Sequence, residues 1–118
     1  MDWNITAGRP VYLQLVEQLE LAVITGVYPP GEKVPPVREL AAEAGVNPNT
    51  MQRALQELEA RGLMESRRTA GRTVTADAAR LKELRHQRAA AQAKAFMEEM
   101  EALGLTKDEV LHLLEEEE

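Results

Sequence analysis

The stretch that decides the fold of this chain is RELAAEAGVNPNTMQRALQELEARGL, residues 38–63. Apolar residues at helical spacing predict one short helix over residues 37–44 and a second over residues 48–60. A glycine ends the first helix, and Asn47 then Pro48 begin the second, because Asn caps helices well and Pro is tolerated at the first helical position. Two short helices joined by such a turn form a helix-turn-helix.

The start of the second helix is polar, which is the feature that bears on function. In a helix-turn-helix these residues face the major groove of DNA, where they can hydrogen-bond to base edges. They are Asn47, Pro48, Asn49, Thr50, Gln52 and Arg53. The pattern also fits an ordinary helix pair with a solvated polar face, and that alternative stays open at this point.

A pair of short strands is predicted directly after this helix, over residues 63–66 and 72–75, around a basic loop. Such a hairpin is typical of the wing of a winged helix-turn-helix. Four arginines lie close together in this part of the sequence: Arg61, Arg67, Arg68 and Arg72. Local positive potential governs contact with phosphates. We therefore expect the wing to contact DNA, with a solvated hairpin as the alternative.

Composition sets wider limits. The chain has 118 residues, enough for one small domain and an appendage, and no cysteine for disulfides or thiolate metal sites. The net charge is −6, but residues 1–75 carry eight Lys/Arg against nine Asp/Glu, whereas residues 76–118 carry six against eleven. The acidity is thus concentrated in the tail. No apolar run suits a membrane span or a signal peptide, so we expect a cytoplasmic protein without a membrane partner.

The N-terminal half supplies the rest of a small core. Trp3 and Ile5 predict a short strand or an arm, followed by a helix over residues 10–25. The apolar face of this helix has a period of about 3.6 residues. It consists of Tyr12, Val16, Leu19 and Val23. The connector YPPGEKVPP follows, and Val27 and Val34 beside or within it are predicted to be short-strand or core residues.

The tail is predicted to form a long helix over residues 77–103 and a last helix over residues 107–116. Thr106 and Glu109 have the spacing of a capping box, which fixes the start of the last helix. We expect this helix to bury Val110, Leu113 and Leu114.

The long tail helix carries a broken apolar stripe, the usual sign of helix–helix association. The stripe consists of Leu81, Leu84, Ala91, Ala95, Met100 and Leu103. One short following helix cannot cover it, so we predict that a second copy of the chain does. Packing of the tail back onto the same subunit is the alternative.

Catalytic chemistry is not indicated. The only histidines are His86 and His112, and His112 has Glu115 and Glu116 at helical spacing, a weak metal-binding pattern. The sequence has no glycine-rich phosphate loop of the right spacing and suggests no nucleophile–base pair. We expect no enzyme activity, no metal and no cofactor.

Two other binding classes can be weighed. Modules for single-stranded nucleic acid stack bases on aromatic side chains. The four aromatic residues lie outside the basic segments: Trp3, Tyr12, Tyr28 and Phe96. Double-stranded DNA is therefore preferred as the partner. A winged helix used only for protein contacts is disfavoured by the polar NPNT sequence and its neighbouring arginines.

Residues 10–74 closely resemble the DNA-binding domain of the GntR family of bacterial transcription regulators. The resemblance rests on an ordered series of motifs: PVYLQL, G…YPPGEKVP, RELA, GVNPNT and LEARGL. The NPNT sequence and the short two-helix tail look like the YtrA-like subfamily. That likeness implies a small dimer without the large effector domains of other branches.

The resemblance also assigns roles to individual residues. It implies that Arg38 contacts DNA from the first helix of the motif. Gln52 stands where many relatives have a DNA-contacting arginine, and Arg53 is offset by one position. At the wing tip only Gly71 and the basic character match the family, and Pro36 replaces a serine common before the helix.

These observations together predict a mainly α fold with a small β-wing. A winged helix-turn-helix domain would cover residues 1–75, and a helical dimerisation tail would cover residues 76–118. We expect a homodimeric transcriptional regulator, more readily a repressor than an activator, that binds an inverted repeat in duplex DNA. A small-molecule effector stays open.

Overall fold

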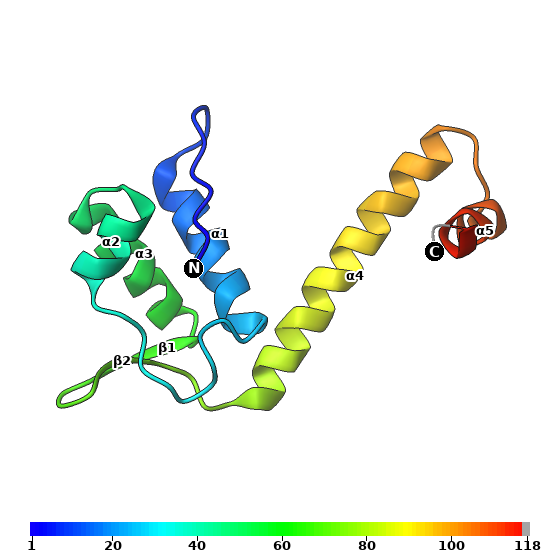
Figure 1. Ribbon diagram of the computed structural model, residues 1–118. Helices are drawn as coiled ribbons and strands as arrows, with labels where there is room; N and C mark the ends of the chain where they lie inside the picture. The colour runs from blue at the N-terminus through cyan, green and yellow to red at the C-terminus, as the bar shows by residue number, and fades with distance from the viewer. Residues whose placement is uncertain (117–118) are drawn as a thin grey trace. The chain divides into compact units, whose positions relative to one another are not determined.

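The computed structural model describes residues 1–116, so the last two residues of the predicted tail region lie outside the described part (Figure 1). In chain order the elements are α1 (Val11–Ile24), α2 (Val37–Ala44), α3 (Pro48–Ala60), β1 (Met64–Arg67), β2 (Gly71–Val74), α4 (Ala78–Ala102) and α5 (Lys107–Glu116). They divide into two compact units. The first unit is Met1–Lys82, and the second begins at Glu83.

Helix α3 lies at the centre of the first unit, and both α1 and α2 pack against it (Figure 1). Its predicted apolar face is confirmed, because the side chains of Met51, Leu55 and Leu58 are all 0% exposed. Leu19 of α1 and Leu40 of α2 are also fully buried. This three-helix core fixes which face of α3 points outward.

Both ends of α3 follow the sequence signals. The Asn49 N–H donates to Oδ1 of Asn47 at 2.7 Å, and Pro48 occupies the first helical position. At the other end, Gly62 has a φ of +76°, and the Leu63 N–H donates to the Leu58 carbonyl at 2.9 Å. A left-handed residue at this position closes a helix and favours glycine.

The wing is an antiparallel hairpin in which Met64 faces Val74 and Arg67 faces Gly71. The connector before α2 runs along the outer side of β2, where Lys33 forms a bridge with Thr73. Val34 is buried, as predicted.

One expectation for the N-terminal half is wrong. The side chain of Val27 is 56% exposed, and the residue is in neither a strand nor the core. For the segment around Trp3 and Ile5, expected to be a short strand or an arm, the structure shows the arm. The amide side chains of Gln14 and Gln18 hold this arm through the backbone groups of its residues.

The side chains of the two glutamines make the hydrogen bonds to the backbone of the arm that a neighbouring strand would otherwise make. Oε1 of Gln14 accepts from the Thr6 N–H at 2.8 Å, and its Nε2 donates to the Thr6 carbonyl at 2.8 Å. Gln18 does the same for Asn4, at 3.0 and 2.7 Å. A helical pattern of apolar residues cannot reveal polar side chains that act in this way, which is why the buried Gln14 was missed.

In the second unit, the turn between α4 and α5 has the predicted features. Gly104 has a φ of +90°. The Thr106 N–H donates to Oε1 of Glu109 at 3.1 Å, and the Glu109 N–H donates to Oγ1 of Thr106 at 3.2 Å. The capping box is thus confirmed in both of its hydrogen bonds.

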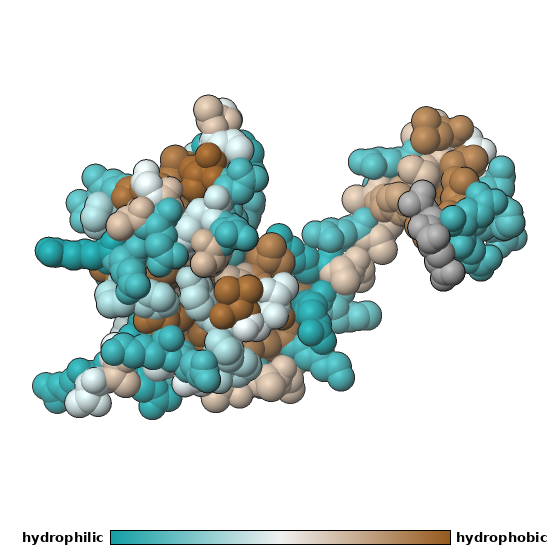
Figure 2. Space-filling view, in the orientation of Figure 1, coloured by the Kyte–Doolittle hydropathy of each residue, from teal (hydrophilic) through white to brown (hydrophobic). Residues whose placement is uncertain are grey.

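The predicted inner face of α5 is only partly confirmed. Val110 is buried, but Leu113 and Leu114 are about half exposed, at 46% and 52%. The prediction was wrong for these two leucines because helical spacing defines a face without supplying a neighbour to cover it. Apolar side chains are visible at the surface of this unit in Figure 2.

The two units divide later than the expected boundary between residues 75 and 76. Leu81 at the start of α4 is only 5% exposed. Nη2 of Arg80 donates to the Arg61 carbonyl at 3.2 Å. The first turn of α4 therefore belongs to the winged unit. No helix among residues 1–116 has the length and apolar character to cross a membrane.

Candidate nucleic-acid interface

The polar start of α3 is displayed at the surface by the core beneath it. Asn47, Pro48 and Asn49 are exposed, and Thr50 is half-buried. Side chains on one face of a helix recur every three to four residues, so the burial of Met51 turns the polar positions outward. In the described structure this end of α3 presents amide, hydroxyl and guanidinium groups together.

Arg53 stands beside α1 as well as at the outer face of α3. Its guanidinium carbon lies 4.7 Å from the ring centroid of Tyr12, a cation–π contact. The residue is nevertheless exposed, whereas its neighbour Gln52 is half-buried. The contact orients the guanidinium without neutralising its charge, so Arg53 can still meet an anion or a base edge.

Arg38 and Arg68 have the fewest contacts within the protein among the arginines predicted to contact DNA. Both are exposed, and neither makes a side-chain hydrogen bond or ion pair with any residue in the range 1–116. Arg67 donates to Oε2 of Glu65 at 3.0 Å, but both side chains are more than half exposed. Exposed ion pairs of this kind contribute little free energy, so Arg67 can exchange Glu65 for a phosphate.

Arg72 has a different environment from the other wing arginines. Its Nε lies 2.7 Å from Oε1 of Glu59 on α3, and its side chain is 15% exposed. The same carboxylate accepts a hydrogen bond from the Ser66 hydroxyl on β1. One acidic residue of α3 thus holds both strands of the wing, and Arg72 serves as an anchor within the protein.

The pKa of Glu59 reflects this arrangement. Partial burial by itself would raise the pKa of the carboxyl group. The hydrogen bonds from Ser66 and Arg72, together with the Arg72 charge, outweigh burial and lower the pKa below its ordinary value of 4.5. The carboxylate is therefore ionised at neutral pH and offsets the charge of Arg72.

Arg61 is also engaged inside the protein. Its Nη1 lies 2.8 Å from Oε2 of Glu20, and its Nε lies 3.2 Å from Oε2 of Glu57. The positive potential expected from four neighbouring arginines was overestimated, because Arg61 and Arg72 each have acidic partners. Glu57 precedes Arg61 by four residues, a spacing visible in the sequence, whereas Glu20 is 41 residues away along the chain and could not be found in this way.

The structure adds one cation that the sequence pattern did not single out. Lys33 is exposed and lies beside the wing, through its bridge to Thr73. A Cβ placed on Gly71 would come within 3.3 Å of the Lys33 Cε. Gly71 itself has a φ of +74°, which favours glycine at the tip of the hairpin. Lys33 could have been predicted as a wing residue only if the pairing of the connector with β2 had been known.

The predicted stripe of α4 is not a single continuous surface. Leu81 is almost fully buried in the winged unit, which leaves little of it for a partner. Leu84 and Met100 are half-buried, Ala91 and Ala95 are exposed, and Leu103 is 74% exposed. An interface on the tail would therefore draw on the residues after Leu81.

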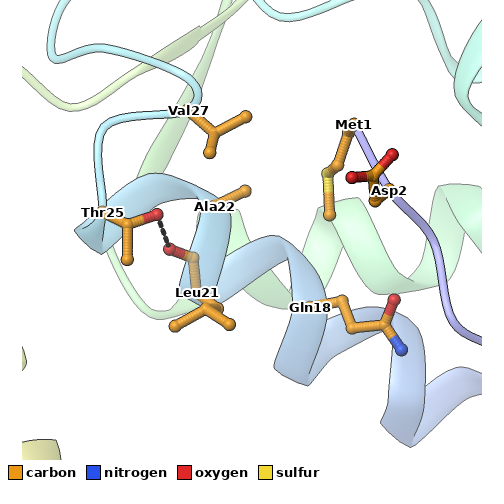
Figure 3. Close-up of a pocket in the computed structure, with 7 residues that line it drawn as sticks. All are labelled: Met1, Asp2, Gln18, Leu21, Ala22, Thr25 and Val27. Carbon is orange, nitrogen blue, oxygen red and sulfur yellow. Dashed lines mark hydrogen bonds between the residues drawn. The ribbon is translucent and has the colours of Figure 1, made fainter.

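A shallow pocket of about 450 Å³ lies on α1 under the N-terminal residues (Figure 3). Its lining consists of Met1, Asp2, Gln18, Leu21, Ala22, Thr25 and Val27. In Figure 3 the Thr25 hydroxyl points to the Leu21 carbonyl, to which it donates at 2.6 Å. Asp2 is the one charged side chain among the lining residues, and Met1 also carries the N-terminal ammonium group, which lies 3.8 Å from Oε1 of Glu43.

The histidine and glutamates of the last helix form a simple surface pair. Nε2 of His112 lies 3.1 Å from Oε1 of Glu116, and both side chains are well exposed. Among residues 1–116, no group of three or more His, Cys, Asp or Glu side chains is arranged to hold a metal ion.

Comparison with known proteins places this geometry in a family. Residues 11–74 match the model of "Bacterial regulatory proteins, gntR family". The uncharacterized HTH-type transcriptional regulator YhcF of Bacillus subtilis is 37% identical over 94% of this chain and 92% of its own length. A GntR family transcriptional regulator from Listeria monocytogenes has a TM-score of 0.87 at 34% identity, covering 96% of this chain and 99% of its own.

A second similar structure is bound to DNA. The DNA-binding domain of AraR in complex with operator ORE1 has a TM-score of 0.54 at 26% identity, covering 64% of this chain and 94% of that domain. The family match covers the helix-turn-helix and the wing together, and the Listeria structure extends the likeness to nearly the whole chain. The chain belongs to the GntR family of bacterial regulatory proteins and is an HTH-type transcriptional regulator.

Proposed function

We propose that this regulator binds an operator in duplex DNA as a homodimer and represses transcription from it. Helix α3 of each subunit would enter a major groove, and the β1–β2 wing would lie on the flanking backbone or in the minor groove. The observation that carries the proposal is the exposed polar start of α3 on a helix whose opposite face is fully buried.

Different residues would have different tasks in this complex. Asn49 and Arg53 are proposed to contact base edges, since amides and guanidinium groups pair with bases in the major groove. Arg38, Arg67 and Arg68 are proposed to contact phosphates, and Lys33 joins them because of its place beside the wing. The remaining residues at this surface would line it: Asn47, Pro48, Thr50, Gln52 and Gly71.

Arg72 receives a changed role. The sequence pattern placed it among the DNA contacts, but its ion pair with Glu59 favours a function in orienting the wing. A wing held at two points on α3 keeps a constant direction relative to the recognition helix. Phosphate contacts from Arg67 and Arg68 would then fall at a constant distance from the bases that α3 contacts.

The homodimer determines the form of the operator. A two-fold symmetric protein binds a two-fold symmetric site, so we propose an inverted repeat. Repression is the simpler outcome for a chain of this build, because occupancy of the operator suffices to exclude polymerase, whereas activation needs a further contact surface. The protein would act in the cytoplasm, and a small-molecule effector is compatible with it.

Selection of bound sequences from a pool of random duplexes tests the proposal. The enriched sequences should contain an inverted repeat. Affinity for the best duplex should fall steeply with salt, with a log–log slope of roughly −0.9 per phosphate neutralised. A pool without enrichment, or an affinity that is flat between low and moderate salt, would show that the proposed surface does not bind DNA.

A further inference from the structure

Helix α4 carries a second regular pattern that differs from its broken apolar stripe. After the part that belongs to the winged unit, residues recur alternately four and three positions apart on one face of the helix. They are Leu84, Arg88, Ala91, Ala95, Glu98 and Ala102, and we call them the α4 seam. This spacing is the one by which helices pair in coiled coils. Two of the six are charged and of opposite sign.

Most of the α4 seam is exposed within its own subunit. Leu84 and Arg88 are half-buried, and the other four residues are exposed. The chain turns back toward α5 beside Met100, whose carbonyl accepts from the Leu105 N–H at 3.2 Å. At about 100° per residue, Met100 lies roughly 140° around the helix from Ala95. The turn to α5 therefore leaves the seam open.

Charge is distributed unevenly along the same helix. The part of the helix before Phe96 is basic around the seam, with Arg85, Arg88 and Lys94, whereas its last part is acidic. The acidic residues are Glu98, Glu99 and Glu101. A parallel second copy would place like charges opposite each other along the seam. An antiparallel copy would place the basic part of each helix against the acidic part of the other.

We propose that two copies of the chain pair through the α4 seam in an antiparallel manner, with Arg88 of each subunit opposite Glu98 of its partner. The proposal rests on the proposed homodimer and specifies the part of its contact surface that α4 contributes. One register satisfies all six positions: Arg88 faces Glu98, Ala91 faces Ala95, and Leu84 faces Ala102.

This register brings compatible side chains together at the centre of the pair and at the charged positions on either side. The small side chains of Ala91 and Ala95 allow the two helices to approach closely at the centre of the pair. Arg88 can donate two parallel hydrogen bonds to a carboxylate, a strong and directional contact. The resulting two Arg88–Glu98 pairs lie symmetrically on either side of the alanines. They fix both the direction and the register, as polar residues in coiled-coil seams do.

Distances between spin labels test the direction of pairing. The chain has no cysteine, so Ala93→Cys and His86→Cys each provide one attachment site in the full-length protein. Both residues are exposed, and they are seven positions apart on the same side of α4. In the proposed register the two copies of residue 93 lie at the same height along the pair. The two copies of residue 86 are separated along the axis by about 21 Å, at about 1.5 Å per residue.

We therefore expect a clearly longer label-to-label distance in the His86→Cys dimer than in the Ala93→Cys dimer. Equal distances at the two positions in a dimeric protein would overturn the antiparallel arrangement and leave the proposed homodimer standing. A protein that stays monomeric at the labelling concentration would overturn the homodimer itself, and the seam with it.

Charge reversal tests the register. Arg88→Glu should weaken dimerisation about tenfold, which corresponds to about 1.4 kcal/mol. The double variant Arg88→Glu with Glu98→Arg should restore it, because the pair is re-formed with opposite polarity. Glu83→Arg is a matched control, since this exposed glutamate lies off the seam and should leave dimerisation unchanged. A double variant as weak as the single one would contradict the Arg88–Glu98 contact.

Discussion

The two units of this chain differ in how completely they bury their apolar residues. In the winged unit the leucines of α1, α2 and α3 that face the core are fully buried. In the described part of the second unit, Val110 is the one apolar residue below 5% exposure, whereas Leu103, Leu111, Leu113 and Leu114 are 46–74% exposed. Leu111 and Leu114 are three positions apart on α5 and share one face of it, and an exposed apolar face is a common feature of interaction sites. The first unit has a complete core, and we propose that the second is completed by another chain.

The largest effect is expected from removing a leucine of the complete core. Leu55→Ala should lower the free energy of unfolding of the winged unit by about 2–5 kcal/mol, through lost burial and a cavity. Trp3, the single tryptophan, lies in this unit and reports its unfolding by fluorescence in urea. Leu114→Ala is the matched change in the tail and should leave this transition unchanged. Equal losses would mean that the two units are not distinct in stability.

A second pair of variants separates sequence preference from affinity in the winged unit. Asn49→Ala should weaken binding to the preferred duplex by about 1–3 kcal/mol and relax the sequence preference, because a base contact is lost. Arg68→Ala should weaken binding to preferred and scrambled duplexes alike, because phosphates are the same in both. Fluorescence anisotropy on the two duplexes measures this. If Asn49→Ala causes the same loss on both duplexes, Asn49 does not contact bases.

Helix caps provide a smaller contrast between the units. Asn47→Ala removes the side chain that accepts from Asn49 and should destabilise the winged unit by about 1 kcal/mol. Thr106→Ala removes one bond of the capping box and should act on dimerisation while leaving the Trp3 transition in place. Urea titration and sedimentation of each variant check the two expectations. A shift of the Trp3 midpoint in Thr106→Ala would show that the units unfold as one.

The smallest expected effect is a pH dependence within the wing. The folded pKa of Glu59 is lowered, so its ionised form stabilises the fold above the ordinary pKa of 4.5. This stabilisation is lost as the pH falls below that value through the lower folded pKa. Glu59→Gln should flatten the stability profile in this acidic window and leave the profile above pH 6 parallel to that of the parent. If the stability profiles of Glu59→Gln and its parent also run parallel at acidic pH, Glu59 does not titrate in that window.

Local signals in the sequence were sufficient for much of the winged unit and for the turn between α4 and α5. Asn47, Pro48 and Gly62 act on the backbone next to them, and the Thr106–Glu109 box closes within four residues, so their effects could be predicted without tertiary structure. The buried faces of α2 and α3 were predictable because each helix has one strongly apolar side.

Interactions between distant residues could not be predicted in this way. The neutralisation of Arg61 depends on Glu20, and that of Arg72 depends on the angle between α3 and the wing. The exposure of Leu113 and Leu114 depends on a neighbour that the chain does not supply to itself. The polar start of α3 was predicted, but Lys33 was not, because its position depends on pairing between the connector and β2.

Sedimentation equilibrium of the full-length protein at tens of micromolar tests most directly whether the tail is completed by a second copy. If the tail of each chain is completed by a second copy, the protein should sediment as a single species of twice the 13.1 kDa chain mass. A variant with Leu111 and Leu114 both changed to Ser should shift toward the single-chain mass, because the exposed apolar surface of α5 is removed. A full-length protein that sediments at 13.1 kDa would contradict the idea that its second unit is completed by another chain.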